Sequence, residues 1–567
     1  LLHRVEEHED EIDIAVLSTL CRLQVADFEL VVKTLFMEEI KEENKFIEEI
    51  KKFGDIDALW NLVEKKYGYH LQEKSLEQLM ILFLITNLSH NLEAKMPSTW
   101  EKFLSPKRAD SILFIDRFMN HSTDSESYDE IANHMEEKLN LGEYIKKLDI
   151  EDYINCDTFK GFDEEIIATL ITNLLEKVGE YEKYRKMVNR RRTSHWFKRF
   201  RHEYETIYNA IEILRLEQEL GKTIKGSSAY DMVDHYTKNY YLFDTFYRKF
   251  YVSYDRIENK EKFFKLVEVI ENTYTHWYLE EMSIKWSRMI EGELKDDIRM
   301  NGLTKQQEFY SQYISPHIQN GERVFIIISD ALRYEAAKEF SDILNRDRQG
   351  KAELSFMQGV IPSYTKLGMA SLLPHKTMEI NEKADILVDG INCAGTENRE
   401  KILSKYSSEA VAIQYNDVKD MKRLDYKEAF GGKKLIYIYH NVIDAIGDKA
   451  STERDVFEAI EKTFEDLNHL IKSLINNVSA TNIYITADHG FIYQRSPLQE
   501  FDKMTKSDVN PMDQGRRFIL AEEPSQEQGI LSLSMKYLLG GNTKLHAIVP
   551  KGTVRFKMQG DGANYVK

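Results

Sequence analysis

The spacing of apolar residues divides the sequence into two parts. As far as residue 310, apolar positions recur every three or four residues, as in Leu17–Cys21 and Leu30–Leu35, and only two prolines occur. This period is typical of amphipathic helices, and rare proline leaves such helices uninterrupted. The pattern predicts an all-helical domain over residues 1–310, with a break into subdomains at glycines between residues 161 and 228.

After residue 320, short apolar runs alternate with helical segments. Val324–Ser329 and Leu435–Tyr439 are apolar at successive positions, which is typical of strands buried on both faces. Helices are predicted at Leu332–Leu344 and along a stripe from Val456 to Leu474. Further strands are predicted at Leu354–Val360, Val411–Tyr415, Asn482–Thr486, Ile530–Met535, Ala547–Val549 and Val554–Met558. Alternating strands and helices predict an α/β domain with a mostly parallel sheet flanked by helices.

Composition limits the classes of protein. The net charge of −18 argues against general coating of nucleic acid, although a local basic surface stays possible. Three widely spaced cysteines indicate neither a disulfide scaffold nor a thiolate zinc site, and they fit a reducing cytoplasm. The longest apolar run, Leu79–Thr86, is too short to span a bilayer, and no signal peptide is found, so no membrane partner is expected. The sequence opens without Met inside a helical pattern, and we expect a fragment of a longer protein.

Acidic and imidazole side chains follow three predicted strands; they are Asp330, Asp444, Asp448, Asp488 and His489. The carboxyl ends of parallel strands meet at one edge of the sheet, where open α/β sheets bind ligands. Carboxylates gathered there repel one another unless a cation holds them. Asp and His without Cys suit zinc, and an oxygen-rich set also suits manganese or magnesium. Taken singly, each Asp can instead cap a helix, and a lone His is commonly structural.

The segment Lys183–His202 holds nine Lys or Arg and no Asp or Glu, with aromatic residues between them. Its cations include Arg190, Arg191, Arg192, Lys198, Arg199 and Arg201. Cations with interleaved rings suit a nucleic-acid backbone and its bases. A basic helix that pairs with acidic neighbours is the commoner alternative, and a surface for a partner protein is the third.

Four phrases in the second part resemble the alkaline phosphatase superfamily and, most closely, the PglZ family of BREX bacteriophage-defence systems. They are SDALRYEAA (Ser329–Ala337), IPSYTKLGMASLLPH (Ile361–His375), YHNVIDAIGD (Tyr439–Asp448) and TADHGFIYQR (Thr486–Arg495), in the family's order. A weaker resemblance covers Arg192–Tyr204, which is similar to the helical region before PglZ domains. The resemblance implies an alkaline-phosphatase-like catalytic domain over residues 320–567.

The resemblance also implies roles for single residues. In the superfamily, two metal ions share a site with a Ser or Thr nucleophile, whose place is taken here by Thr365. Asp330, Asp488 and His489 match the ligands of one metal, and Asp444 matches a ligand of the other. Asp448 stands where the superfamily usually has His, which makes the second site richer in oxygen. The superfamily's last His ligand lies near the end of the domain; in this chain His546 is the only late His, and His440 is a further ligand or acid.

Arg333 is the predicted phosphate-binding residue. It follows Asp330 by three residues, and its forked donors suit a phosphoryl oxygen pair. The alternative is a salt bridge to Glu335 or to another nearby carboxylate.

The sequence therefore favours a metal-dependent phosphoesterase with Thr365 as nucleophile and two divalent ions, zinc first and manganese or magnesium next. The PglZ resemblance implies other BREX proteins as partners and a nucleic-acid phosphodiester, DNA among them, as the substrate. The alternative is a catalytically degenerate domain that serves as a scaffold for defence proteins. No Cys or Ser stands in a sulfatase-like motif near Thr365.

Overall fold

The computed structural model describes residues 2–41, 43–221, 223–295, 297–347, 351–447, 452–496, 503–504 and 508–557. The chain forms two compact units: unit 1 comprises Leu1–Ile211 and Ile257–Leu266, and unit 2 comprises Glu212–Arg256 and Val267–Lys567. The division falls inside helix α13 (Arg201–Leu220) and again inside helix α16 (Phe264–Thr273), most of which belongs to unit 2. Residue 310, the predicted border of the helical domain, therefore marks a change of secondary structure but not the edge of a compact unit.

Unit 1 consists of helices and connecting loops in its described part. The longer helices are α1 (Leu2–Leu20), α2 (Phe28–Glu39), α3 (Lys45–Phe53), α4 (Ile56–Tyr67), α5 (Leu76–Asn91), α7 (Arg108–Met119), α8 (Ser125–Leu139), α11 (Lys160–Leu175) and α12 (Tyr181–Arg191). Shorter ones are α6 (Ser98–Glu101), α9 (Leu141–Ile145), α10 (Ile150–Tyr153) and η1 (His195–Lys198). Side-chain caps begin several of them: Asp27 accepts from the Leu30 N–H at α2, and Ser75 accepts from the Gln78 N–H at α5.

Helix α5 forms the centre of unit 1. Its apolar run from Leu79 to Leu88 is buried on all sides, which explains why this helix lacks a polar face. None of the helices in the described ranges combines the length and apolarity that crossing a membrane requires.

Unit 2 combines helices with four small sheets. Its helices are α14 (Ala229–His235), α15 (Tyr241–Asp255), α16 (Phe264–Thr273), α17 (Glu280–Met289), α18 (Ser315–Gln319), α19 (Tyr334–Arg346), α20 (Thr365–Ser371), α21 (Thr396–Ser404), α22 (Tyr415–Val418), α23 (Arg423–Phe430), α24 (Val442–Gly447), α25 (Val456–Val478) and α26 (Lys536–Leu539). Its strands are β1 (Val324–Ser329), β2 (Met378–Ile380), β3 (Ile386–Val388), β4 (Ile391–Asn392), β5 (Ala410–Gln414), β6 (Leu435–His440), β7 (Asn482–Thr486), β8 (Lys503–Met504), β9 (Asp513–Gln514), β10 (Ile519–Ala521), β11 (Ile530–Ser534), β12 (His546–Pro550) and β13 (Arg555–Phe556).

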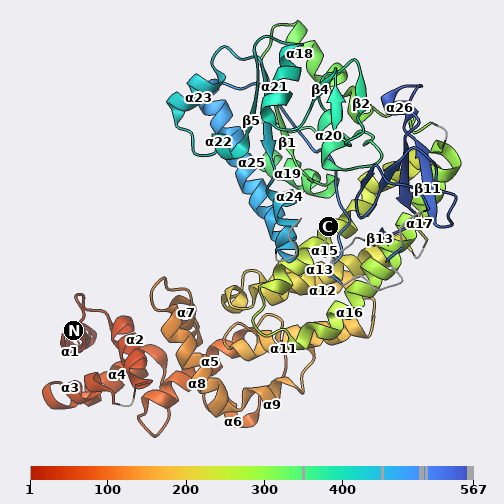
Figure 1. Cartoon of the computed structure of the whole chain (residues 1–567). Helices are drawn as coiled ribbons and strands as arrows, with labels where there is room; N and C mark the ends of the chain where they lie inside the picture. The colour runs from red at the N-terminus through yellow and green to blue at the C-terminus, as the bar shows by residue number, and fades with distance from the viewer. Residues whose placement is uncertain are drawn as a thin grey trace. The chain divides into compact units, whose positions relative to one another are not determined.

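The main sheet has the strand order β5-β6-β1-β7, and all its pairings are parallel. Helices surround β1 and β5, with α19, α21, α22 and α25 beside them in Figure 1. The predicted α/β class with a parallel sheet behind a helical region is thus confirmed. Register aligns the strand ends, because Ser329 lies opposite His440 and Ile328 lies opposite Thr486. The residues that follow β1, β6 and β7 consequently meet at one edge.

Three smaller sheets complete unit 2: β11-β12-β10-β9, β2-β3-β4 and β13-β8. The prediction of a strand at Leu354–Val360 is wrong. Gln358 makes only an isolated bridge to Lys305, and its side-chain amide bonds the backbone of Ile298 and Met300. The β2-β3-β4 sheet was not predicted, because its strands have only two or three residues each.

Helix α20 is anchored in the core of the main sheet. Leu367, Ala370 and Leu372 are fully buried in one cluster with the inner side chains of β1 and β6. The Tyr437 hydroxyl on β6 donates to the Leu372 carbonyl at 3.0 Å. Burial of a leucine side chain stabilises by about 1.5–3 kcal/mol, so the start of α20 is held firmly against the sheet.

Candidate metal centre

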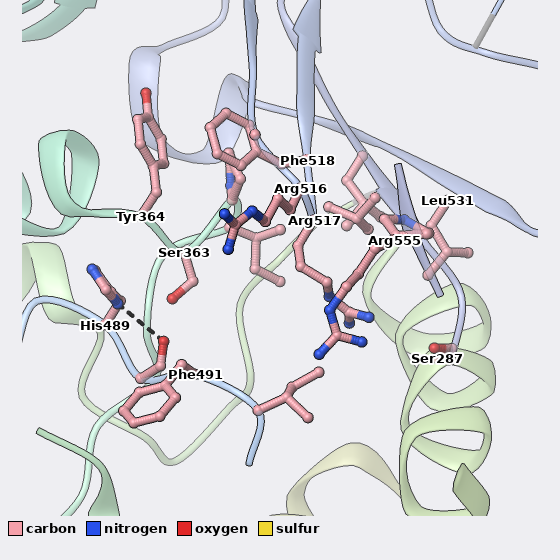
Figure 2. A pocket seen from close by; sticks show the side chains of 18 of the residues that line it. Ser287, Ser363, Tyr364, His489, Phe491, Arg516, Arg517, Phe518, Leu531 and Arg555 are labelled. Carbon is pink, nitrogen blue, oxygen red and sulfur yellow. Dashed lines mark hydrogen bonds between the residues drawn. The ribbon is translucent and has the colours of Figure 1, made fainter. Parts of the chain in front are cut away.

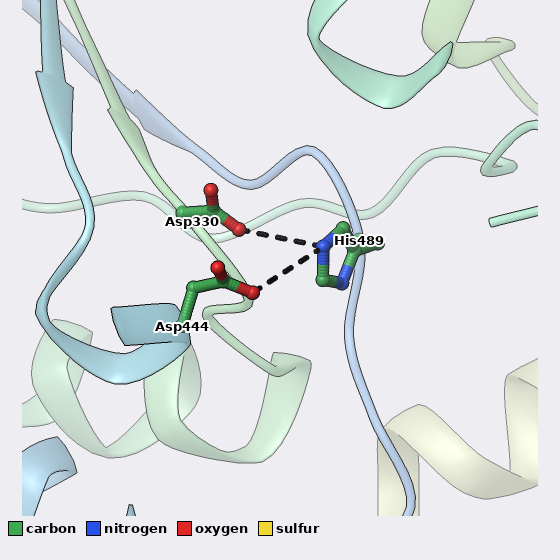
Figure 3. Close-up of side chains that lie close together, drawn as sticks. All are labelled: Asp330, Asp444 and His489. Atoms are coloured by element: carbon green, nitrogen blue, oxygen red, sulfur yellow. Dashed lines mark ion pairs between the residues drawn. The ribbon is translucent and has the colours of Figure 1, made fainter. Parts of the chain in front are cut away.

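Three acid and imidazole groups come together beyond the carboxyl ends of the parallel strands. Asp330 follows β1, Asp444 lies in α24 after β6, and His489 follows β7; their ligand atoms all lie within 4.8 Å of one another. Figure 3 shows both carboxylates directed at the same ring nitrogen of His489. The Nε2 atom is 3.4 Å from Asp330 Oδ1 and 3.9 Å from Asp444 Oδ1.

The backbone fixes which nitrogen of His489 faces the acids. Nδ1 lies 3.0 Å from the Gly490 carbonyl oxygen. A carbonyl can only accept, so Nδ1 carries the proton in this hydrogen bond and the neutral ring presents the lone pair of Nε2. That lone pair faces the carboxylates, which is the orientation a metal-binding histidine needs.

Asp488 places a third carboxylate beside His489 Nε2. Its Oδ1 accepts from the backbone N–H groups of Ala331 and His489, at 3.1 and 2.9 Å. Its Oδ2 is buried, makes no hydrogen bond within the described structure, and lies 3.6 Å from His489 Nε2. Burial, and to a smaller extent the nearby charge of Asp444, raise the pKa of Asp488 to about 6, although the two N–H donors act in the opposite direction.

The turn after β1 brings Asp330 and Asp488 together. Ala331 has φ +64°, a left-handed conformation that is uncommon outside glycine, and this conformation directs its N–H at Asp488. The Asp330 N–H donates to the His440 carbonyl at 2.7 Å, which continues the β1–β6 pairing past the strand end. Such strained residues persist only where their surroundings hold them, and they cluster at functional sites.

Thr365 enters the site at the first residue of α20. Its hydroxyl lies 3.0 Å from His489 Nε2. Gly368, one turn later, contacts the backbone of Asp488 so closely that a Cβ there would lie 2.3 Å from the Asp488 carbonyl oxygen. The buried Gln306 side chain donates to that same carbonyl oxygen at 2.7 Å and accepts from the Val360 N–H at 3.0 Å. Gly368 and Gln306, which the sequence did not single out, therefore set the distance between Thr365 and the acids.

A cavity of about 780 Å³ opens beside Thr365 and His489. Figure 2 shows His489, whose Nε2 lies 3.0 Å from the Thr365 hydroxyl, at one side of the cavity and three arginines across from it. These arginines are Arg516, Arg517 and Arg555. The sequence did not single them out either, although the Arg516-Arg517 pair was a visible signal.

The donor set fits one divalent cation. Asp330, Asp444, Asp488 and His489 offer oxygens and one imidazole nitrogen, all directed at one place, and a buried carboxylate oxygen lacks a donor there. Hard carboxylates with one imidazole suit zinc or manganese. A cation among these acceptors would remove their mutual repulsion and favour the ionised form of Asp488.

The remaining residues predicted as metal ligands lie elsewhere or are not described. Asp448 lies outside the described residues. His440 is buried at the end of β6, where Nδ1 is 3.1 Å from Ser329 Oγ and Nε2 is 3.7 Å from Asp466. His546 begins β12, opposite Ala521 and Ser534, and does not belong to the cluster around His489. A second metal site therefore stays a prediction from the family resemblance.

Arg333 forms the salt bridge that was the alternative to a phosphate-binding role. Its guanidinium pairs with the buried Asp244 carboxylate of α15 and donates to the Phe491 carbonyl. It also stacks on the Tyr493 ring, 4.0 Å from the centroid. These contacts occupy the guanidinium fork that a phosphate would need and hold the segment after His489, so the phosphate-binding role of Arg333 stays a prediction.

The basic segment of unit 1 is largely structural. Arg191 is buried and makes a two-pronged ion pair with Asp163 at 3.0 and 2.6 Å, while Arg192 pairs with Glu205. Trp196 is buried as well and donates to the Asp157 carbonyl, so it cannot stack on a base. The exposed cations that remain are Lys186, Arg190, Lys198, Arg199 and Arg201. A nucleic-acid surface here would have to rely on these five and stays a prediction.

Comparison with known proteins gives consistent matches. The family model described as the BREX system PglZ alkaline phosphatase-like domain matches residues 309–567. The chain is 45% identical over 561 residues to the alkaline phosphatase-like protein PglZ of Bacillus cereus (strain H3081.97), covering 99% of this chain and 66% of the relative. It is 30% identical over 593 residues to the alkaline phosphatase-like protein BrxZ of Escherichia coli O9:H4 (strain HS), covering 100% of this chain and 68% of the relative. The chain thus spans about two thirds of the length of these relatives.

Proposed function

Because this chain belongs to the PglZ family of BREX alkaline phosphatase-like proteins, we propose that it hydrolyses a phosphodiester at the Thr365–His489 site with the help of a bound divalent metal ion. One observation carries the proposal. The Thr365 hydroxyl lies 3.0 Å from His489 Nε2, and the carboxylates of Asp330, Asp444 and Asp488 lie around that nitrogen. Other BREX proteins are the proposed partners, and DNA is the proposed source of the diester.

The proposed reaction has two displacements at phosphorus. In the first, Thr365 Oγ1 bonds to phosphorus and the ester oxygen of one substituent leaves, taking a proton to become an alcohol. In the second, water bonds to phosphorus, the Thr365 oxygen leaves and regains its proton, and a phosphomonoester is released. A divalent cation, when bound, supplies positive charge that lowers the pKa of the hydroxyl and neutralises the phosphoryl oxygens.

The residues of the chain orient the reacting groups. Asp330, Asp488 and His489 would hold the cation, with Asp444 beside them. The Gly490 carbonyl keeps the proton of His489 on Nδ1, so that Nε2 is available as a ligand. The core packing of α20 holds Thr365 at the attacking position, which replaces a diffusive encounter with a fixed geometry.

Metal dependence tests this proposal. After dialysis against a chelator, hydrolysis of a chromogenic phosphodiester is expected to fall at least about 10²-fold, and added zinc or manganese should restore it, since a divalent cation at this site supplies the charge that the proposed reaction needs. Asp488→Asn should abolish the restoration and lower the metal content measured by elemental analysis. Full activity of chelated protein, or a metal-loaded wild-type protein without any diesterase activity, would favour the scaffold alternative.

Because Gly368 packs closely on Asp488, we expect the single methyl group added by Gly368→Ala to lower turnover strongly. In Gly368→Ala the new Cβ would meet the Asp488 carbonyl, so α20 must shift and carry Thr365 away from His489. Turnover is expected to fall by about 10²-fold, the loss that a misplacement of about 1 Å produces. Gly359→Ala is the matched control, because its Cβ would lie an ordinary 3.8 Å from Gln306 and turnover should stay within about twofold. Equal kcat values for the two variants would contradict the role given to Gly368.

A further inference from the structure

The cavity beside Thr365 has walls of two kinds. Ile290, Leu531 and Val549 form an apolar wall, and Arg516, Arg517 and Arg555 form a basic one. Its volume of about 780 Å³ lies within the range of about 300–1,000 Å³ that small-molecule sites occupy. The cavity therefore has room for a nucleotide or a strand end, but not for a duplex.

Within the basic wall, Arg517 is distinguished by its hydrogen-bond partners. Its Nη1 donates to the carbonyl oxygens of Gly552 and Val554, at 3.0 and 2.9 Å. No carboxylate pairs with it anywhere in the described ranges. Its side chain keeps partial exposure, as expected of a cavity wall. Burial and, less strongly, the charge of neighbouring Arg555 lower the pKa of Arg517 to about 9, and two like charges thus lie close together in the cavity wall.

Two other arginines of unit 2, Arg248 and Arg333, pair with acids of the same chain. Arg248 donates to both oxygens of Glu335, at 2.9 and 3.0 Å, and Arg333 pairs with Asp244. In both cases an acid of the same chain neutralises the guanidinium, as buried charges require. Arg517 differs because it lines the cavity and has no carboxylate partner in the described ranges. Figure 2 shows the guanidinium groups of Arg517 and Arg555 next to each other in the cavity wall.

We propose that Arg517, together with Arg555, binds a second phosphate of the substrate while Thr365 attacks the first. This inference rests on the proposed function and names its substrate class: a single-stranded oligonucleotide, or its end, in place of a simple diester. The guanidinium fork suits two phosphate oxygens, and an anion there would relieve the repulsion between the two arginines. Phe491 and Phe518 also line the cavity; one face of the Phe518 ring is stacked on Tyr364, and aromatic rings at such a site suit stacking with a base.

Matched dinucleotides test the subsite. The substrates are TpT and its phosphorylated forms pTpT and TpTp, each assayed by chromatography with wild-type protein and with Arg517→Gln. Wild-type kcat/KM should be about 10- to 100-fold higher for one phosphorylated form than for TpT, as expected for charge-assisted hydrogen bonds. Arg517→Gln should remove this preference and change kcat/KM for TpT by less than about threefold. Arg399→Gln, an arginine of α21 that does not line the cavity, should keep the preference.

Binding separates this inference from the proposed function. Calorimetry with the Thr365→Ala protein needs no turnover, and it should show tighter binding of the preferred phosphorylated dinucleotide than of TpT, lost in Thr365→Ala/Arg517→Gln. If no diester is cleaved but this binding difference is found, the subsite stands and the hydrolase proposal fails. A preference that survives Arg517→Gln, or no difference between the dinucleotides in either assay, overturns the subsite. Should Arg517→Gln not fold, Arg517→Lys keeps the charge without the fork; it should lower the preference at least about threefold, and an unchanged preference overturns the proposal.

Discussion

Replacing Thr365 with alanine is expected to lower kcat for phosphodiester hydrolysis at least about 10³-fold, because the variant lacks the hydroxyl that forms the proposed covalent intermediate. The structure gives the reason: Thr365 is the first residue of a helix that is buried from Leu367 to Ser371, and its hydroxyl lies 3.0 Å from His489 Nε2. The measurement is kcat on a chromogenic diester, with thermal unfolding to show that the fold is unchanged. Thr365 is partly buried and its methyl group is small, so the variant should fold normally.

Thr365→Ser is the matched control for the hydroxyl. It keeps the oxygen and loses only a methyl group, and turnover is expected to stay within about tenfold of the wild type. Rapid acid quench followed by mass spectrometry should find, on the peptide that contains Thr365 in wild-type and Thr365→Ser protein, a phosphoryl group that still carries the second ester substituent of the substrate. If Thr365→Ala turns over at the wild-type rate, water attacks the phosphorus directly and Thr365 is not the nucleophile.

The main sheet could be predicted because its strands carry their signal locally. Val324–Ser329 and Asn482–Thr486 were predicted with the bounds that the structure has; the first is a continuous apolar run buried along its whole length, and the second is a partly buried strand at the edge of the sheet. Leu354–Val360 carries a similar run, yet its neighbours bond Gln358 through side chain and backbone and no strand lies alongside. Whether an apolar run becomes a strand depends on partners that are distant in sequence, and periodicity does not report them.

The site shows the same limit. Asp330, Asp488 and His489 were found because parallel strand ends must meet, and the structure brings them together with Thr365. Gly368 was invisible to this reasoning, because its importance lies in a contact with a backbone 120 positions later in the chain. The role of Arg333 could not be predicted either, because the sequence does not show whether its guanidinium pairs with a carboxylate of the chain or with a ligand.

Arg333→Ala is expected to destabilise unit 2 by about 3–5 kcal/mol, because it leaves the Asp244 carboxylate buried without its cation. Asp244 keeps two hydrogen bonds, from the Tyr236 and Tyr274 hydroxyls at 2.6 Å each, but these cannot replace a full charge. The segment after His489 also loses the donor to the Phe491 carbonyl. Urea unfolding followed by tyrosine and tryptophan fluorescence measures the loss, and Arg256→Ala, whose ion pairs with Glu458 and Glu461 are exposed, should change stability by less than about 1 kcal/mol.

The double variant Arg333→Met/Asp244→Asn decides between a structural and a phosphate-binding arginine. It removes both charges and keeps the volume, and replacing a whole buried ion pair is often nearly neutral, so most of the lost stability should return. If Arg333 only holds the segment that carries His489, turnover in the double variant should stay within about tenfold of the wild type. If instead the fold recovers and kcat stays reduced by about 10²-fold or more, the guanidinium leaves Asp244 during the reaction and binds the phosphoryl group after all. In that case the Arg333–Asp244 pair would form in the resting site and break in the substrate-bound site, a role that the stability measurement alone could not reveal.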